Sequence, residues 1–157
     1  LPRWVRGHGG YALTLPGALR KFKPRELTIQ VPENNCRGKL VPRYSQPTFL
    51  AAFANAPQYG GGMRIAPEAK LDDGRLDVCL VKDINKLKLF SLFPTVYFGR
   101  HTTIPQVDYF QATRVRVDTE IPVDVYADGE YVCRTPIEVT VADKAITVIV
   151  PDRSPKN

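Results

Sequence analysis

Apolar and polar residues alternate with a period of two along most of this chain, in short runs bounded by Pro, Gly, Asn and Asp. Such alternation is typical of strands, whose successive side chains point to opposite faces of a sheet, and the bounding residues are typical of turns. The runs cover residues 27–31, 48–55, 76–81, 109–118, 123–127, 131–133, 137–141 and 145–150. Short strands at regular spacing predict a mainly β fold, an antiparallel β-sandwich with one or two short helices.

Helical spacing is confined to two segments. Residues 86–98 carry apolar side chains three and four positions apart, which predicts an amphipathic helix with its N-cap within Asp83–Asn85. Pro94 predicts a kink or a division into two short helices, and Gly99 ends the segment. A further short helix is predicted from Pro16 to Phe22.

The length of 157 residues fits one domain, 1–157, and a chain of this size buries roughly 70% of its unfolded surface. No apolar run approaches the ~20 residues that span a bilayer, and the first residues lack the apolar stretch of a secretory signal. The chain does not begin with Met, so we expect a piece of a longer protein.

The cysteines, Cys36, Cys79 and Cys133, are widely spaced and form no C-x-x-C pair, which disfavours a zinc site. Cys79 lies in a strand-like apolar run and is expected in the core. Reduced thiols in a cytosolic protein are therefore the expected state.

The formal net charge is +6, and several Lys and Arg residues cluster near the N-terminus. One interpretation is a solvated basic surface, and the other is attraction to anionic lipid headgroups, to which each basic residue contributes about 1 kcal/mol. A nucleic acid is a less suitable partner, because the aromatic residues do not interleave with the basic ones as a base-stacking surface requires.

The stretch from Asn55 to Asp77, NAPQYGGGMRIAPEAKLDDGRLD, carries the strongest signal for chemistry. Its consecutive glycines, residues 60–62, allow positive φ or a close approach of the backbone. Its acidic turn, Asp72-Asp73-Gly74, can place carboxylate and carbonyl oxygens around a hard cation.

This stretch resembles the signature of the C-terminal domain of the diacylglycerol kinase catalytic-domain family, which includes bacterial lipid kinases and sphingosine kinases. A second similarity lies at Tyr126–Glu130, an Asp-Gly-Glu motif, followed by Thr135-Pro136 and another strand. The resemblance extends from about Gly10 to Pro151. The domain in that family is likewise a β-sandwich, so the resemblance and the alternation imply the same fold.

The resemblance also implies roles for particular residues. In the family an Asp and two main-chain carbonyls hold Mg²⁺, and the matching positions are Asp73, Lys70 and Arg75; the proton acceptor for the lipid hydroxyl matches Glu130. From the residues alone two plainer interpretations stay open: Asp73 can cap its own backbone, and Glu130 can be an ordinary hairpin residue. Glycines 60–62 lack P-loop spacing and are better explained by a bulge or close packing than by an ATP site.

The function implied by the resemblance is a lipid kinase, which transfers the γ-phosphate of ATP to a lipid hydroxyl, diacylglycerol-like or sphingoid, with the help of Mg²⁺. In that family ATP is bound mainly by an N-terminal domain with a Gly-Gly-Asp-Gly-Thr motif, which is not found in this chain. We therefore expect the C-terminal half of a lipid kinase, inactive alone. Its partners would be that nucleotide-binding domain and a lipid at the cytoplasmic surface of a membrane.

Two alternatives stay open at this point. Residues 86–98 can form a helix packed on the sandwich, or a wall or gate for an acyl chain. The whole domain can instead be a non-catalytic β-sandwich that binds a lipid or a protein. The oligomeric state, a homodimer included, is not decided by the sequence.

Overall fold

The computed structural model describes residues 23–33, 38–59 and 61–149. The predicted helix over 16–22, most of the N-terminal basic cluster and Cys36 lie outside these residues.

Within the described ranges the chain forms two antiparallel sheets. The strands are β1 (Arg25–Pro32), β2 (Leu40–Ala54), β3 (Leu76–Lys82), β4 (Val107–Ala112), β5 (Arg114–Thr119), β6 (Asp124–Ala127), β7 (Glu130–Arg134) and β8 (Ile137–Thr140). The larger sheet has the order β4-β3-β2-β1-β5-β8, and β6 and β7 form a separate hairpin.

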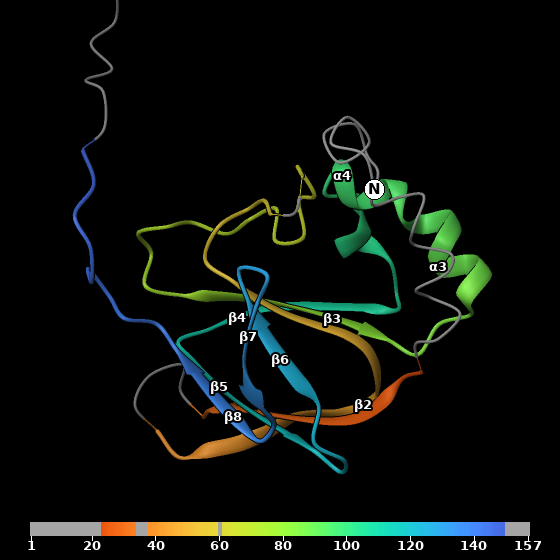
Figure 1. Ribbon diagram of the computed structural model, residues 1–157, viewed down its shortest axis with the longest axis horizontal. Helices are drawn as coiled ribbons and strands as arrows, with labels where there is room; N and C mark the ends of the chain where they lie inside the picture. The colour runs from red at the N-terminus through yellow and green to blue at the C-terminus, as the bar shows by residue number, and fades with distance from the viewer. Residues whose placement is uncertain (1–22, 34–37, 60, 150–157) are drawn as a thin grey trace, which may run out of the picture.

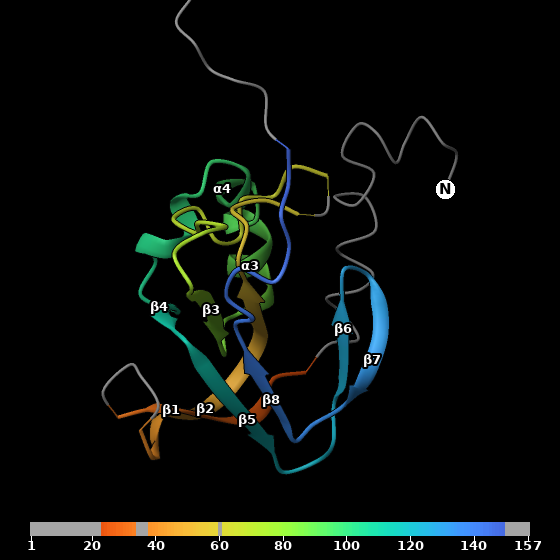
Figure 2. The same cartoon turned by 90° about the vertical axis from the view of Figure 1, so that its left-hand side faces the viewer.

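The larger sheet folds over on itself (Figures 1 and 2). Only Thr113 separates β4 from β5, yet β4 pairs with β3 while β5 pairs with β1. The long strand β2 likewise pairs with β1 along its first part and with β3 along its second part, the change occurring at Thr48. Strands β3 and β4 therefore lie over β1 and β5, which confirms the predicted antiparallel β-sandwich.

The core lies between these two halves. Ile29 of β1, Val78 of β3 and Val115 of β5 are fully buried and belong to one apolar cluster. They occupy the inward-facing positions of the alternating runs, so the apolar residues of the period-two pattern are the ones that are buried. Burial of each such side chain stabilises the fold by about 1.5–3 kcal/mol.

The hairpin β6–β7 is attached at its base and free at its tip. Thr135 is buried at this base, and its main-chain amide donates to the carbonyl oxygen of Val123 at 3.0 Å. The Thr135 hydroxyl accepts the main-chain amide of Val123 at 2.9 Å and also makes a hydrogen bond with the hydroxyl of Thr119. Asp128 and Gly129 form the predicted tight turn with φ of 51° and 91°. The tip points toward the end of the molecule that carries the helices (Figures 1 and 2).

The predicted division of the helical segment is confirmed. Helix α3 (Lys86–Leu92) is followed by α4 (Pro94–Tyr97) and the 3-10 turn η1 (Arg100–Thr103). Asn85 is the N-cap, and its side chain accepts a main-chain amide of the first turn at 2.9 Å. Gly99, with φ of +67°, ends α4 in the left-handed conformation that glycine favours.

The helices contact the sandwich on one side only. Val96 packs against the apolar cluster around Cys79, but no residue of α3 or α4 is buried. Leu87, Phe90 and Phe98 are 81%, 49% and 72% exposed. The segment therefore packs on the sandwich, as one interpretation had it, and also presents an apolar surface to solvent. No helix among the described residues is long and apolar enough to cross a membrane.

Two strand predictions are wrong in part. Residues 109–118 form two strands rather than one, because the chain changes partners at Thr113 while its alternation continues. Residues 145–149 form no strand, although the turn at Asp143-Lys144 is present. Strand β8 itself pairs with β5, and the chain after it passes the turn at Gly74, where Asp143 Oδ1 would lie 3.8 Å from an added Cβ.

Candidate functional site

The loop 55–75 joins β2 to β3 and packs on the outer face of the β3–β4 half of the sandwich. Ile65, Ala66 and Ala69 of the loop form an apolar cluster with Cys79, and the small residue Ala52 packs beside them. Small side chains on both surfaces let the loop backbone lie close to the sheet. Burial raises the pKa of the Cys79 thiol to about 12, as suits the core role predicted for it.

Gly61 and Gly62 lie in a turn at the start of this loop. Tyr59 and Met63 exchange two main-chain hydrogen bonds of 3.0 and 3.1 Å across it. Gly61 and Gly62 have φ of 80° and 95°, a conformation that side chains disfavour. The local, structural interpretation of the glycines fits this geometry.

Asp73 lies in an Asx turn at the other end of the loop. Its Oδ1 accepts the main-chain amide of Arg75 at 2.9 Å, so the self-capping interpretation accounts for one of its carboxylate oxygens. The described residues provide no further hydrogen bond or ion pair to Asp73. Together with Lys70 and Arg75, it lines a shallow hollow of about 490 Å³ in which Oδ2 is available to a ligand.

A buried polar cluster lies beside this hollow. Asp77 is fully buried; Tyr109 donates its hydroxyl to Asp77 Oδ1 at 2.5 Å, and Gln111 Nε2 donates to Oδ2 at 3.2 Å. Burial, and then the bond to Asp77, raise the pKa of Tyr109 well above its usual range.

Gln111 connects this cluster to the acidic turn. Its Oε1 accepts from Arg75 Nη1 at 3.3 Å, and its side chain lines the same hollow as Asp73. A continuous path of hydrogen bonds therefore runs from Tyr109 through Asp77, Gln111 and Arg75 to Asp73.

His101 holds the middle of the loop. It is buried in η1, and its Nε2 lies 3.0 Å from the carbonyl oxygen of Ile65. Since a carbonyl only accepts, Nε2 carries the proton, and buried Nδ1 has no partner among the described groups. Burial lowers the pKa of His101, which keeps the ring neutral near pH 7.

Glu130 begins β7 directly after the Asp128-Gly129 turn and is exposed. Within the described part of the chain its carboxylate makes no hydrogen bond or ion pair, although its main chain pairs with Ala127. A carboxylate held on a tight turn, with its oxygens unengaged, is available to a ligand at this end of the molecule.

The predicted residues thus fall into two places. Lys70, Asp73 and Arg75 lie together along one hollow, and Glu130 does not line it. The hairpin tip and the loop nevertheless lie toward the same end of the sandwich (Figures 1 and 2). Among the described residues no three His, Cys, Asp or Glu side chains are grouped to hold a metal ion. A cation at Asp73 would therefore need main-chain carbonyls and water as its other ligands, a donor set of hard oxygens that suits Mg²⁺.

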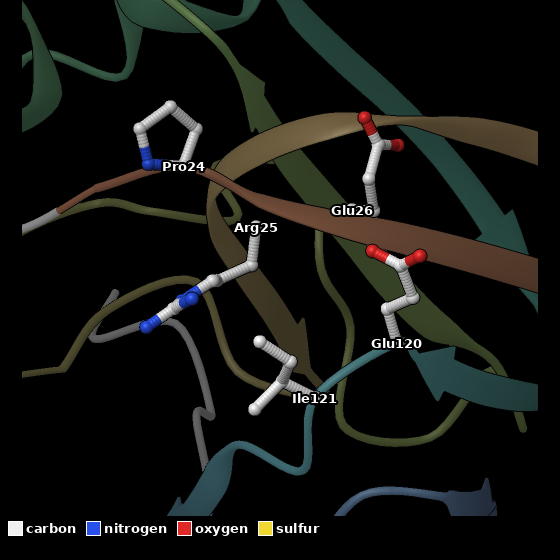
Figure 3. Close-up of a pocket in the computed structure, with 5 residues that line it drawn as sticks. All are labelled: Pro24, Arg25, Glu26, Glu120 and Ile121. Atoms are coloured by element: carbon white, nitrogen blue, oxygen red, sulfur yellow. The ribbon is translucent and has the colours of Figure 1, made fainter.

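A second hollow, about 180 Å³, lies beside the start of β1 (Figure 3). It is lined by Pro24, Arg25, Glu26, Glu120 and Ile121. Arg25 pairs with Thr48, which in turn pairs with Lys82 at the end of β3 remote from the acidic turn, so this hollow is separate from the Asp73 site.

Sequence reasoning missed the polar cluster under the loop. Asp77 interrupts the apolar run 76–81, and a charged residue at that position was the available signal. Tyr109 and Gln111 stand two positions apart, on one face of a strand, but nothing in the sequence reveals that the strand lies beside β3. The direct pairing of Asp77 with Gln111 across β3 and β4 is visible only in the fold.

Comparison with known proteins identifies relatives of this chain. The family model described as the YegS C-terminal NAD kinase beta sandwich-like domain matches residues 2–150. A diacylglycerol kinase of Mycobacterium tuberculosis is 31% identical over 150 residues, which cover 95% of this chain and 46% of that protein. A diacylglycerol kinase of Bacillus subtilis is 26% identical over 145 residues, covering 92% and 45%.

A solved structure has the same fold. The crystal structure of a diacylglycerol kinase from Bacillus anthracis superposes with a TM-score of 0.60 at 19% identity, over 83% of this chain and 44% of that one. The chain thus spans less than half the length of the relatives it matches. Because the family model covers nearly all of it, the chain belongs to the YegS C-terminal domain family, the lipid kinase domain that its two motifs resemble.

Proposed function

We propose that this domain is the C-terminal half of a lipid kinase that transfers the γ-phosphate of ATP to a hydroxyl of a diacylglycerol-like or sphingoid lipid. The observation that carries the proposal is the similarity to diacylglycerol kinases along 95% of the chain. The exposed Asp-Gly-Glu turn and the available oxygen of Asp73 support it, because both put carboxylates where a ligand can reach them.

Glu130 is proposed as the general base. Its carboxylate would accept the proton of the lipid hydroxyl while that oxygen bonds to the γ-phosphorus and the bond to the β–γ bridging oxygen breaks. General-base catalysis of this kind contributes about 10²–10⁴-fold to a rate. Glu130 suits the role because it is exposed, held on a rigid turn and without a competing partner among the described residues.

Asp73 is proposed to hold Mg²⁺ together with the main-chain carbonyls of Lys70 and Arg75. When bound, Mg²⁺ would supply charge stabilisation for the phosphoryl oxygens. The Asx turn positions the Asp73 carboxylate, and the side chains of Lys70 and Arg75 do not enter into this role, so their basic character is no obstacle.

Helix α3 and the end of α4 are proposed to contact the membrane that supplies the lipid. Exposed Leu87, Phe90 and Phe98 provide apolar surface, and exposed Lys86 and Lys88 provide positive charge for anionic headgroups. Since ATP is a cytoplasmic substrate, this contact would be made at the cytoplasmic surface by peripheral association.

The nucleotide is proposed to bind mainly to a part of the parent protein outside this chain, since the relatives are about twice as long. On this proposal the isolated domain transfers no phosphate. Appreciable lipid phosphorylation by this chain alone would contradict that expectation.

The proposal is tested on the full-length parent protein. Radiolabelled transfer from ATP and Mg²⁺ to diacylglycerol, sphingosine and phosphatidylglycerol in mixed micelles would identify the acceptor. Transfer to one of these lipids is the expected result. No transfer to any lipid, by protein shown to be folded, would instead favour a non-catalytic module that binds a lipid or a protein.

A further inference from the structure

We infer that Asp77, Tyr109 and Gln111 are positioning residues, which hold the turn at residues 70–75 in the shape that binds a divalent cation. This inference rests on the proposed metal role of Asp73. It goes beyond that role because it assigns a positioning function to side chains that would not contact the cation.

The first anchor is the Tyr109 hydroxyl. It donates to Asp77 Oδ1 at 2.5 Å, and the Tyr109 side chain packs against the apolar cluster that includes Ala69, the residue directly before the turn. The hydroxyl bond to Asp77 fixes the orientation of the Tyr109 side chain, which lies against the start of the turn. The entrance to the turn is thereby tied to a strand of the sandwich.

The second anchor is Gln111. Its amide nitrogen donates to Asp77 Oδ2 at 3.2 Å, and its oxygen accepts from Arg75 Nη1 at 3.3 Å. The main-chain amide of Arg75 in turn donates to Asp73 Oδ1 at 2.9 Å. The exit of the turn is therefore tied to the same buried carboxylate as its entrance.

Asp77 can serve both anchors because it cannot move. It is fully buried in β3, and Gln111 is its direct partner across β4. A buried polar group with all its partners present is held in one arrangement, since any rearrangement would leave a donor or acceptor unsatisfied. Both anchors are therefore hydrogen-bonded to a side chain that is fixed in the sheet.

The turn needs such support because main-chain carbonyls would supply much of its cation site. Mg²⁺ tolerates little deviation from octahedral geometry, so the positions of the carbonyls of residues 70 and 75 decide whether it binds. Those positions depend on the backbone between Ala69 and Arg75, the two points that the anchors hold. Outer partners of this kind typically change metal affinity by about 10–100-fold.

The test uses this chain, ¹⁵N-labelled, with no nucleotide and no activity readout. Tyr109→Phe removes only the hydroxyl, Gln111→Met removes the other anchor at similar volume, and Tyr126→Phe is a control that removes an exposed tyrosine hydroxyl from the hairpin. Amide hydrogen exchange is measured without metal, and Mg²⁺ binding is then followed by the amide shifts of residues 70–75.

In Tyr109→Phe and Gln111→Met we expect the amide hydrogens of residues 66–75 to exchange about tenfold faster than in wild type, because each variant loses one net hydrogen bond. The Mg²⁺ concentration at half-saturation should rise about tenfold or more. Tyr126→Phe should change neither quantity. Should Tyr109→Phe fail to fold, Gln111→Met tests the shared carboxylate from the other side.

Wild-type exchange and wild-type Mg²⁺ titration in both variants would overturn the inference. Faster exchange with an unchanged titration would also overturn it, because the anchors would then be structural only. If Mg²⁺ moves no amide of residues 70–75 in the wild type, the proposed metal site itself fails, and the inference fails with it. The lipid kinase proposal would still stand on its own assay.

Discussion

The Asp73 carboxylate accepts the main-chain amide of Arg75 at 2.9 Å, so one of its oxygens shapes the turn while the other remains available in the adjoining hollow. The two oxygens therefore have separable roles. Asparagine keeps an oxygen that can make the same Asx turn but lacks the negative charge, whereas alanine keeps neither.

The separable roles predict different results for Asp73→Asn and Asp73→Ala. In the parent protein, Asp73→Asn should raise the Mg²⁺ requirement at least as much as the ~10–100-fold that loss of an outer partner costs. Its free energy of unfolding should stay within about 0.5 kcal/mol of wild type, while Asp73→Ala should lose about 1 kcal/mol through the missing cap. Mg²⁺ titrations of activity and urea unfolding check both. A wild-type Mg²⁺ requirement in Asp73→Asn would remove Asp73 from the metal site.

His101 predicts a fall in stability on mild acidification. Burial lowers its pKa in the folded protein below the ordinary value of about 6.5. As the pH falls below 6.5, the unfolded chain therefore binds a proton that the folded chain does not, and the free energy of unfolding decreases by up to about 1.4 kcal/mol per pH unit until the folded pKa is reached. Above 6.5 both states are neutral, and this residue causes no pH dependence.

Urea unfolding between pH 5 and 8 measures this effect. His101→Gln, whose amide can still donate to the Ile65 carbonyl, should show a smaller loss between pH 7.5 and 5.5 than wild type. Identical pH profiles for the two proteins would show that His101 stays equally protonated in both states.

Gly99 predicts a steric effect that can be isolated from backbone strain. An added Cβ there would lie 2.8 Å from Cβ of Pro67, which belongs to the loop, whereas Gly74 has the same φ of +67° and only an ordinary contact of 3.8 Å. Both alanine variants should lose about 1–2 kcal/mol from the left-handed backbone. Gly99→Ala should lose a further ~1–3 kcal/mol from overpacking against Pro67. Thermal or urea unfolding measures both variants. If Gly99→Ala and Gly74→Ala lose the same unfolding free energy, the loop at Pro67 moves away from the added methyl group at no free-energy cost.

The exposed apolar residues of the helices predict membrane affinity. Replacing Leu87 and Phe98 by serine in the parent protein should weaken binding to vesicles of anionic lipid by on the order of tenfold per residue, since each would lose about 1.5 kcal/mol or more of burial. Ile146→Ser is a matched control, because this residue is 82% exposed in the segment after β8. Sedimentation with vesicles makes the comparison. An equal loss in the control would mean that apolar surface alone, and not this helix, decides binding.

Local patterns predicted much of the fold. The alternation predicted most strands, and Asp128-Gly129 predicted the hairpin turn. The segment Asp83–Asn85 predicted a helix cap, and Pro94 predicted a kink or a division of the helix, because each of these features depends on residues close in sequence. The change of partners at Thr113 was hidden, because a strand that passes from one neighbour to another keeps its alternation. Residues 145–149 alternate as well, but alternation does not supply a pairing partner.

Some residues of the candidate site could likewise be predicted from local motifs, and others could not. The Asp73 turn and the Glu130 turn stand in local motifs, so the residues of both could be named in advance. The cluster of Asp77, Tyr109 and Gln111 could not, because it is formed by the register between β3 and β4. His101 showed no signal either, since its partner Ile65 lies 36 residues earlier in the chain.

The most direct test of the account is single-turnover phosphoryl transfer by the full-length parent carrying Glu130→Gln, with Glu120→Gln as a control for loss of an exposed carboxylate elsewhere. We expect a rate lower by about 10²–10⁴-fold in Glu130→Gln, with lipid and ATP binding little changed, and a wild-type rate in Glu120→Gln. A wild-type rate in Glu130→Gln, with the protein folded and saturated, would contradict the claim that this domain supplies the general base.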